Sequence, residues 1–258
     1  APPESCYSSV VTRDSVRLAF TLAALNGLDI LSGDVQNAYI NAESKENLYV
    51  KEAGPEFGPA FVGRPCMIVK ALYGLKSSGA RWHEHMAQTL RDMGYISCKA
   101  DPDVWMKAKV KPTGEEYWEY VLVYSDDILV ISHDPHVVMV GLTHAYTLKE
   151  GSVAKPKTYL GADIAEHVFQ DAVDPGTTRW SMLSHTYIRR ALVDMEQHLT
   201  DIGQALNKQR TPTAAGYRPE LDSSPLLNEK LTNYYQGLIG VLRWATELGR
   251  IDILTPVS

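Results

Sequence analysis

The stretch YVLVYSDDILVIS, residues 120–132, sets two adjacent carboxylates, Asp126 and Asp127, inside an apolar, strand-forming run. Apolar and β-branched residues fill positions 121–124 before the pair and 128–131 after it. Burying one unpaired carboxylate is costly, and burying two side by side costs more. The pattern predicts two strands joined by a hairpin turn at the pair, with another group compensating the negative charge.

The residues alone leave two interpretations of this pair open. The first is a hairpin tip whose carboxylates are simply solvated, although such tips favour Asn-Gly or Asp-Gly and this turn has no Gly. The second is a divalent-metal site, because Mg²⁺ takes oxygen ligands from one or two carboxylates and from substrate phosphates.

A third carboxylate is needed from elsewhere, and Asp34 in SGDVQNAYIN (32–41) is the candidate. It ends a predicted strand that could lie beside the hairpin. Three Asp residues at neighbouring strand ends would suit two Mg²⁺ ions about 3.5–4 Å apart. Nucleotidyl transfer needs that arrangement, since its catalysis consists mostly of positioning and charge neutralisation.

The composition is typical of a globular protein with one large or two modest cores: 258 residues, 45% hydrophobic and 22% charged. No apolar run is long enough to predict a membrane span, and the N-terminus has no signal-peptide pattern. Cys6, Cys66 and Cys98 are odd in number and far apart, which favours thiols in a reducing compartment over a disulfide framework or zinc site.

Charge is distributed unevenly along the chain, whose net charge is −6. Residues 1–60 hold 4 Lys/Arg against 8 Asp/Glu, whereas residues 64–111 hold 9 Lys/Arg against 4 Asp/Glu. The basic segment could face phosphates, or it could be an ordinary solvated surface, and the composition does not decide between them.

Hydrophobic periodicity and turn residues predict alternating helices and strands without regular βαβ spacing, which indicates an α+β fold with a largely antiparallel sheet. The predicted helices cover residues 13–26, 78–95, 135–149, 185–199 and 228–249. The predicted strands cover residues 47–52, 66–72, 103–110, 117–124, 127–132, 157–168 and 178–184, and residues 28–40 are a strand that runs into a turn or short helix.

A series of motifs, in this order and over nearly the whole chain, resembles the reverse transcriptase of copia-type LTR retrotransposons. The matching blocks are YSSVVTRDSVRL, DVQNAYINAESKENLYVKEAGPEFG, ALYGLKSSGARWHE, SCKADPDVWMK, YVLVYSDDILV, TYLGADI, SMLSHTYIRRAL and YYQGLIGVLRWATELGRIDI. The combination of ALYGLK with YSDDILV at this separation is highly specific.

The resemblance implies a right-hand polymerase fold with a palm of antiparallel sheet plus helices. Residues 1–183 would form partial fingers and the palm, and residues 184–258 the helical thumb and the start of the connection. The basic fingers strands that precede this region in the family have no match before Arg13. We therefore expect either a fragment of a polymerase or a diverged element that has lost its fingers.

By this resemblance Asp34, Asp126 and Asp127 are the catalytic carboxylates. Together with the Val35 carbonyl they would hold two Mg²⁺ ions, with Mn²⁺ as an alternative. Tyr39 would lie beneath the incoming sugar and exclude a 2′-hydroxyl, although the residues alone favour an ordinary core aromatic.

Other positions carry weaker expectations by the same resemblance. Lys76, Ser77 and Gly79 would bind the dNTP, but Ser77 departs from the family's usual Gln. Tyr124 and Ser125 would contact the primer terminus, and Ser125 replaces the more usual Val while keeping a hydroxyl that can donate a hydrogen bond.

Two further groups would contact nucleic acid. Tyr159, Leu160 and Gly161 match a strand hairpin that grips the primer terminus. Gln236, Gly240 and Trp244 are four residues apart and so share one helix face, which resembles a thumb helix that follows the minor groove; plain helix packing is the alternative.

The remaining polar residues are weaker candidates. Lys149 or Lys155 is a candidate proton donor to the leaving pyrophosphate. His83 and His85 are two positions apart on a helix, point apart, and are poor metal ligands.

The implied function is RNA-directed DNA polymerase activity, a two-metal nucleotidyltransferase reaction on dNTPs. The implied partners are an RNA or DNA template with its primer, and dNTPs. Other parts of a Pol polyprotein, an integrase upstream and an RNase H downstream, are also implied, whereas no membrane is. The implied location is the element's cytoplasmic virus-like particle, with the nucleus as a second location after import. The alternative is a diverged or domesticated, non-catalytic nucleic-acid-binding module, and ALYGLK disfavours a palm-type nucleotide cyclase.

Overall fold

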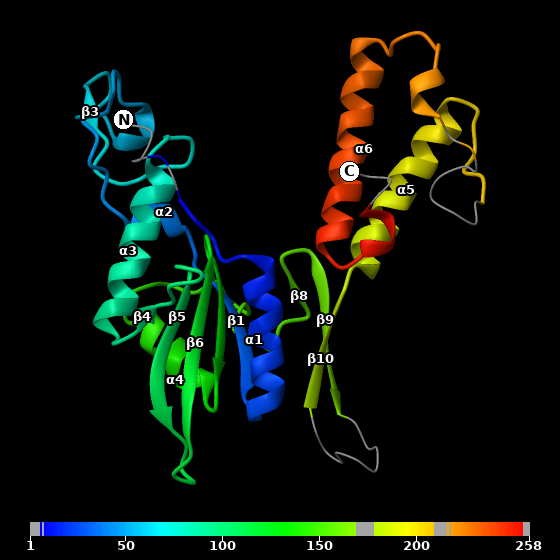
Figure 1. Cartoon of the computed structure of the whole chain (residues 1–258). Helices are drawn as coiled ribbons and strands as arrows, with labels where there is room; N and C mark the ends of the chain where they lie inside the picture. The colour runs from blue at the N-terminus through cyan, green and yellow to red at the C-terminus, as the bar shows by residue number, and fades with distance from the viewer. Residues whose placement is uncertain (1–5, 7, 169–177, 209–215, 217, 255–258) are drawn as a thin grey trace. The chain divides into compact units, whose positions relative to one another are not determined.

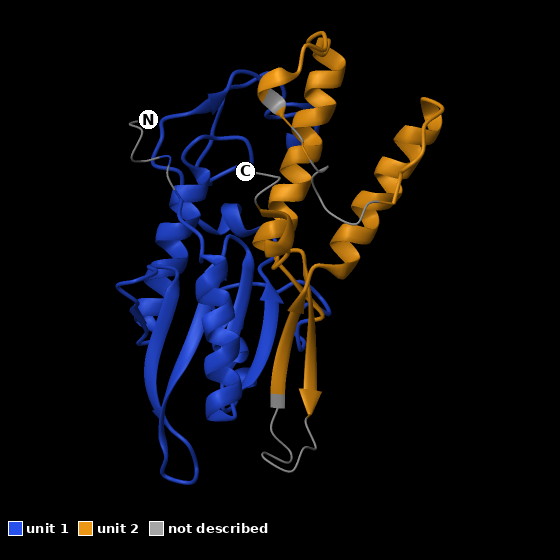
Figure 2. Ribbon diagram, turned by 45° about the vertical axis from the view of Figure 1, so that its right-hand side comes forward, with its two compact units in different colours: residues 1–156 blue, residues 157–258 orange. Residues whose placement is uncertain are grey.

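The chain divides into two compact units, residues 1–156 and 157–258 (Figure 2). Both combine helices with antiparallel strands, which confirms the predicted α+β class. The predicted functional boundary between residues 183 and 184 falls inside the second unit and stays a prediction, and parts of the predicted thumb lie outside the described residues. The residues described in this computed structural model are 6, 8–168, 178–208, 216 and 218–254.

A five-stranded antiparallel sheet forms the centre of the first unit, in the order β1-β7-β6-β5-β4. Its strands are β1 (Asp29–Asp34), β7 (Asp127–Ser132), β6 (Glu116–Tyr124), β5 (Val104–Val110) and β4 (Ile96–Ser97). Because side chains alternate between the two faces of a strand, the apolar runs of β6 and β7 supply buried residues to both faces.

Helices cover both faces of this sheet (Figure 1). Helix α1 (Arg13–Asn26) contacts β6 and β7, begins at the capping hydroxyl of Thr12, and ends at Gly27, whose φ of 57° suits a residue without a Cβ. Helices α3 (Ser78–Asp92) and α4 (Pro135–Thr143) contribute to a core with alternate residues of the central strands. The core therefore fixes the strand ends that carry the candidate carboxylates.

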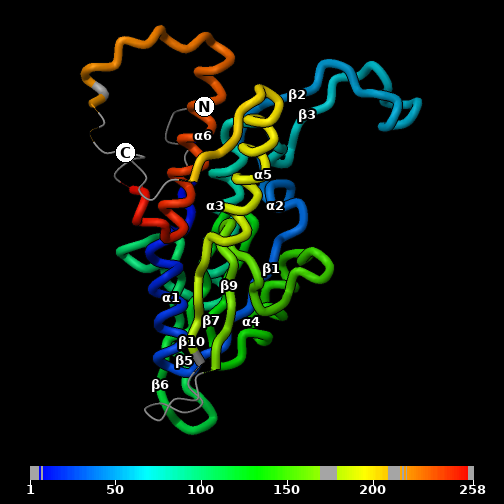
Figure 3. Tube along the Cα trace, turned by 90° about the vertical axis from the view of Figure 1, so that its right-hand side faces the viewer, coloured from blue at the N-terminus to red at the C-terminus, as the bar shows by residue number. Residues whose placement is uncertain are grey.

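A small hairpin of β2 (Tyr49–Val50) and β3 (Cys66–Met67) projects from the first unit away from the large sheet (Figures 1 and 3). The short helix α2 (Ala38–Asn41) and the 3₁₀ turn η2 (Pro55–Phe57) belong to the same region. The predicted strands at 47–52 and 66–72 are thus present, although each is only two residues long.

The predicted helix over 135–149 is too long, because α4 ends at Thr143. Residues 144–145 form a turn, after which the Tyr146 N–H donates to the Leu142 carbonyl at 2.9 Å, and the chain then extends alongside residues 34–36. The Gln36 N–H donates to the Thr147 carbonyl at 2.9 Å, and the Lys149 N–H donates to the Asp34 carbonyl at 2.8 Å. These long-range bonds replace the helical ones, and they join this segment to the strand that carries Asp34.

The second unit pairs a small sheet, in the order β10-β9-β8, with two long helices. The predicted single strand over 157–168 is wrong, since Leu160 and Gly161, at φ 49° and 82°, turn the chain between two strands. The elements are β8 (Thr158–Tyr159), β9 (Ala162–Val168), β10 (Thr178–Leu183), α5 (His185–Asp201), η3 (Pro219–Leu221), α6 (Glu229–Glu247) and η4 (Ile251–Ile253). Within the described ranges, none of the helices has the length and apolarity that crossing a membrane requires.

Candidate active site

The carboxylate pair lies at the hairpin turn between β6 and β7, as the sequence predicts. Tyr124 pairs with Asp127 across the strands, so Ser125 and Asp126 form a two-residue turn. Ser125 has a φ of 57°. Positive φ at the first residue of such a turn is normally supplied by Gly, so Ser125 holds a backbone conformation that is costly for a residue with a Cβ.

Strand β1 brings Asp34 to this turn. Asp34 is the register partner of Asp127, and directly opposed residues of an antiparallel pair share one face of the sheet. The Val35 N–H also donates to the Asp126 carbonyl at 2.9 Å. Backbone pairing therefore gathers three carboxylates and Val35 at one corner, although Asp34 is distant from the others in the sequence.

The electrostatics of this corner are those of excess negative charge. Burial, and then the neighbouring carboxylates of Asp126 and Asp34, raise the pKa of Asp127, and the Lys149 ammonium opposes this. Lys149 Nζ lies 3.4 Å from Asp34 Oδ2. Lys155 instead lies 3.6 Å from Asp29, so Lys149 is the candidate proton donor that the fold places at the carboxylates.

The donor chemistry of the corner fits a hard divalent cation. Carboxylate oxygens are the ligands that Mg²⁺ prefers, and an added cation would relieve the repulsion that raises the pKa of Asp127. Within the described part of the chain, no three His, Cys, Asp or Glu side chains already form a ready metal-binding group. The fit therefore rests on the donor type and the backbone register.

Two stacked aromatic rings lie near the carboxylates. The rings of Tyr39 and Tyr73 have centroids 4.5 Å apart at an interplanar angle of 27°. The pKa of Tyr73 is raised by burial and then by the charges of Asp126, Tyr39 and Asp34, which places its hydroxyl within their electrostatic reach. Sequence reasoning missed Tyr73, although it is the aromatic residue of ALYGLK.

The loop before α3 brings some of the predicted dNTP contacts together and separates others. A Cβ on Gly79 would lie 3.9 Å from the Tyr39 hydroxyl, so this glycine borders the aromatic pair. Lys76 is exposed, whereas Ser77 is buried and its hydroxyl donates to Glu46. Roles for Lys76 and Ser77 in dNTP binding stay predictions.

The nucleic-acid contacts predicted in the second unit fall into two groups. Tyr159 is buried beside the Leu160–Gly161 turn. A Cβ on Gly161 would come within 3.1 Å of Trp244 Nε1, so this glycine lets the indole pack against the turn. Their contact with a primer stays a prediction.

Gln236 and Gly240 are exposed along α6, whereas Trp244 of the same helix is half-buried. A Cβ on Gly240 would meet nothing within 4 Å. This stretch of α6 is thus open, as close approach of a partner requires, and minor-groove tracking stays a prediction.

The two candidate histidines contact different partners. His83 Nε2 lies 2.6 Å from Asp103 Oδ1, and His85 Nδ1 lies 2.9 Å from the Tyr146 hydroxyl. His83 therefore contacts the residue before β5, whereas His85 contacts a residue of the segment after α4.

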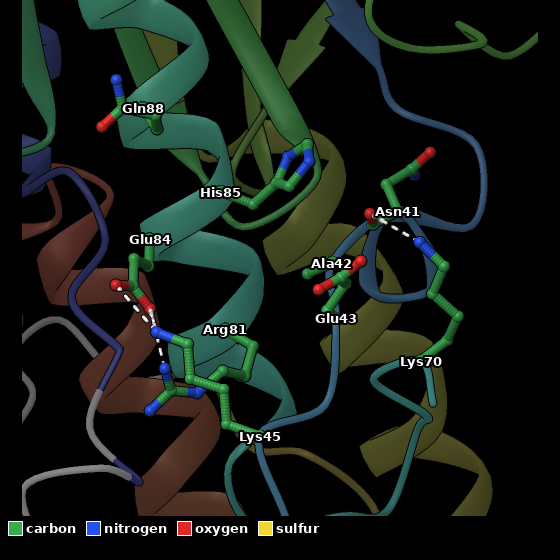
Figure 4. Close-up of a pocket in the computed structure, with 9 residues that line it drawn as sticks. All are labelled: Asn41, Ala42, Glu43, Lys45, Lys70, Arg81, Glu84, His85 and Gln88. Carbon is green, nitrogen blue, oxygen red and sulfur yellow. Dashed lines mark hydrogen bonds and ion pairs between the residues drawn. The ribbon is translucent and has the colours of Figure 1, made fainter. Parts of the chain in front are cut away.

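A polar pocket of about 370 Å³ lies beside α2 and α3, and sequence reasoning did not anticipate it (Figure 4). Lys45 and Arg81 both pair with Glu84, at 3.2 and 2.7 Å. The charges of this pocket are thus largely compensated by one another. Its lining consists of Asn41, Ala42, Glu43, Lys45, Lys70, Arg81, Glu84, His85 and Gln88.

Comparison with known proteins gives a family match over most of the chain. The model of the family described as reverse transcriptase (RNA-dependent DNA polymerase) matches residues 4–204. A putative transposon Ty5-1 protein of Saccharomyces cerevisiae is 27% identical in an alignment of 233 residues that covers 87% of this chain and 67% of that protein.

Two plant proteins give shorter matches. The retrovirus-related Pol polyprotein from transposon RE1 of Arabidopsis thaliana is 27% identical over 56% of this chain. The corresponding polyprotein from transposon TNT 1-94 of Nicotiana tabacum is 28% identical over 52%. The matched stretch spans 10% of the length of each polyprotein.

Proposed function

The chain belongs to the reverse transcriptase (RNA-dependent DNA polymerase) family, as a copia-type retrotransposon member, and we propose that it copies a nucleic-acid template into DNA from a primer. The observation that carries this proposal is the register of Asp34 with Asp127, together with the Val35–Asp126 backbone bond. The large sheet would be the palm, the β2–β3 region partial fingers, and α5 with α6 the thumb.

In the proposed reaction the primer 3′-hydroxyl loses its proton to a solvent water, and its oxygen bonds to the α-phosphorus of a dNTP. The bond between the α-phosphorus and the bridging oxygen breaks, and pyrophosphate leaves. Asp34 and Asp126, with the Val35 carbonyl, would hold two Mg²⁺ ions, and Asp127 would be an auxiliary ligand. The ions would supply charge neutralisation for the phosphates.

The protein side chains would bind and orient the substrates. Tyr39, held by its stack with Tyr73, would lie beneath the deoxyribose and crowd a 2′-hydroxyl. Lys149 Nζ, which lies 3.4 Å from Asp34 Oδ2, would donate a proton to the leaving pyrophosphate. The named relatives are transposon Pol proteins, so we propose that the chain acts beside the other enzymes of such a polyprotein.

Primer extension tests this proposal. The purified chain, an RNA template with a DNA primer, dNTPs and Mg²⁺ are expected to give extended product, and Asp126→Asn is expected to abolish it. Asp134→Asn is the matched control, because Asp134 is an exposed carboxylate at the other end of β7. Salt-sensitive binding of the primer–template without any extension by the wild type would favour the non-catalytic binding module instead.

A further inference from the structure

The catalytic turn is held by hydrogen bonds to both of its carbonyl groups. The Trp82 indole Nε1–H donates to the Ser125 carbonyl at 2.8 Å, and the Val35 N–H donates to the Asp126 carbonyl at 2.9 Å. Both donors come from segments far from the turn in the sequence. Together they fix the orientation of the two peptide groups from which the Asp126 side chain projects.

The turn needs such restraint because Ser125 has a φ of 57°. A residue with a Cβ loses roughly 1–2 kcal/mol in the left-handed region. Strained conformations of this kind persist only where the surroundings determine them. A hydrogen bond to the carbonyl of Ser125 holds this strained conformation directly.

Trp82 is itself held firmly in place. It is 2% exposed, and its ring meets the ring of Tyr146 edge-on at 5.2 Å. The Tyr146 hydroxyl lies 2.9 Å from His85 Nδ1 and 2.6 Å from Thr89 Oγ1, both on α3 with Trp82. The Tyr146 phenol is protonated at neutral pH, as an ordinary tyrosine is, and burial raises its pKa further, to about 12. The indole N–H therefore presents a fixed donor to the turn.

We propose that Trp82 is a positioning residue, whose indole N–H holds the Ser125 peptide in its left-handed conformation and so aims the Asp126 carboxylate. This inference rests on the proposed function in one respect, since it assigns Trp82 an effect on the reaction at Asp126. The hydrogen bond from the Trp82 indole to the Ser125 carbonyl is present whether or not the protein is an active polymerase.

The competing view is that Trp82 only fills the core, to which it belongs. Trp82→Phe separates the two, because Phe keeps an aromatic ring in the core and removes the donor. We expect Trp82→Phe to lower the turnover number for single-nucleotide addition about 10- to 100-fold while the KM for dNTP changes less than threefold.

A double-mutant cycle with Ser125→Gly gives the decisive comparison, since Gly adopts a positive φ without strain. In the Ser125→Gly background the loss caused by Trp82→Phe is expected to shrink at least fivefold. An equal loss in both backgrounds would show that Trp82 acts independently of the turn and would overturn the proposal.

Indole ¹⁵N–¹H spectra test the same bond without activity. The indole signal that disappears in Trp82→Phe should exchange slowly with deuterium and should broaden when Mn²⁺ alone is added. Trp118 is 43% exposed and lies near the start of β6, at the end of the strand away from the turn, so its signal should exchange fast and stay sharp. Fast exchange at Trp82 refutes the positioning role, whereas slow exchange in a protein that extends no primer refutes only the proposed function.

Discussion

Ser125→Val is expected to destabilise the protein by about 1–2 kcal/mol. The left-handed region costs a residue with a Cβ roughly 1–2 kcal/mol, and strained positions reach about 1–3 kcal/mol. Ser125, at a φ of 57°, has a short polar side chain and falls at the low end of that range. Val is β-branched and falls at the high end. Equilibrium urea unfolding followed by circular dichroism measures the difference.

Two matched variants isolate the backbone effect. Ser125→Ala removes the hydroxyl without adding a branch and should change the free energy of unfolding by less than about 0.5 kcal/mol. Ala108→Val adds the same branch at an exposed position of β5, where φ is not positive. Strands favour Val, so this control should not destabilise. If Ser125→Val unfolds at the same urea concentration as Ser125→Ala, the reasoning about the left-handed turn is wrong.

Three other substitutions have distinct expected outcomes. Without divalent metal, the raised pKa of Asp127 means that the folded state binds its proton more tightly than the unfolded state, so stability falls as pH rises from the ordinary value of 3.8 through the raised value. Asp127→Asn should remove that slope and raise the Tm at pH 7 in EDTA; parallel Tm–pH curves would contradict this. Glu119→Ala should cost about 2–6 kcal/mol in urea unfolding, since two buried hydrogen bonds are lost and a buried donor that loses its acceptor costs about 1–3 kcal/mol. Those bonds come from the hydroxyls of Tyr95 and Ser132, each at 2.6 Å; a loss below 1 kcal/mol would mean that they find other acceptors. Tyr73→Leu should weaken discrimination of dNTP over rNTP about two- to twelvefold, because the lost ring stacking is worth about 0.5–1.5 kcal/mol. If the ratio of kcat/KM for dNTP to kcat/KM for rNTP is unchanged, Tyr73 has no part in recognising the sugar.

Local pattern was sufficient to predict the elements nearest the site. The apolar runs on both sides of Asp126 predicted the β6–β7 hairpin because few other structures bury such runs and leave adjacent carboxylates at a bend. Gly27 predicted the end of α1 because only a residue without a Cβ adopts its backbone conformation cheaply. The antiparallel class followed from the irregular order of strands and helices.

The features that were missed depend on contacts between distant segments. Tyr146 and Leu148 continue an apolar helical pattern, yet the chain leaves the helix and extends from Thr147 onward, because the backbone there bonds to Asp34 and Gln36. The proximity of Tyr73 to Asp126 likewise exists only in the folded chain. Lys149 could be named as a candidate, but its choice over Lys155 required the fold, because the ion pair with Asp34 joins residues 115 positions apart.

The segment that follows α4 has a consequence for self-association. Strand β1 is an outer strand of the large sheet, and an outer strand with unpaired backbone groups invites another chain to add to it. Here the carbonyl of Asp34 accepts from Lys149, and Ser32 and Ala154 exchange backbone bonds. The side chain of Asp34 thus stays accessible while its backbone carbonyl is already hydrogen-bonded within the chain. The outer edge of β1 beside the carboxylates therefore resists the addition of a strand from another molecule, and so resists aggregation.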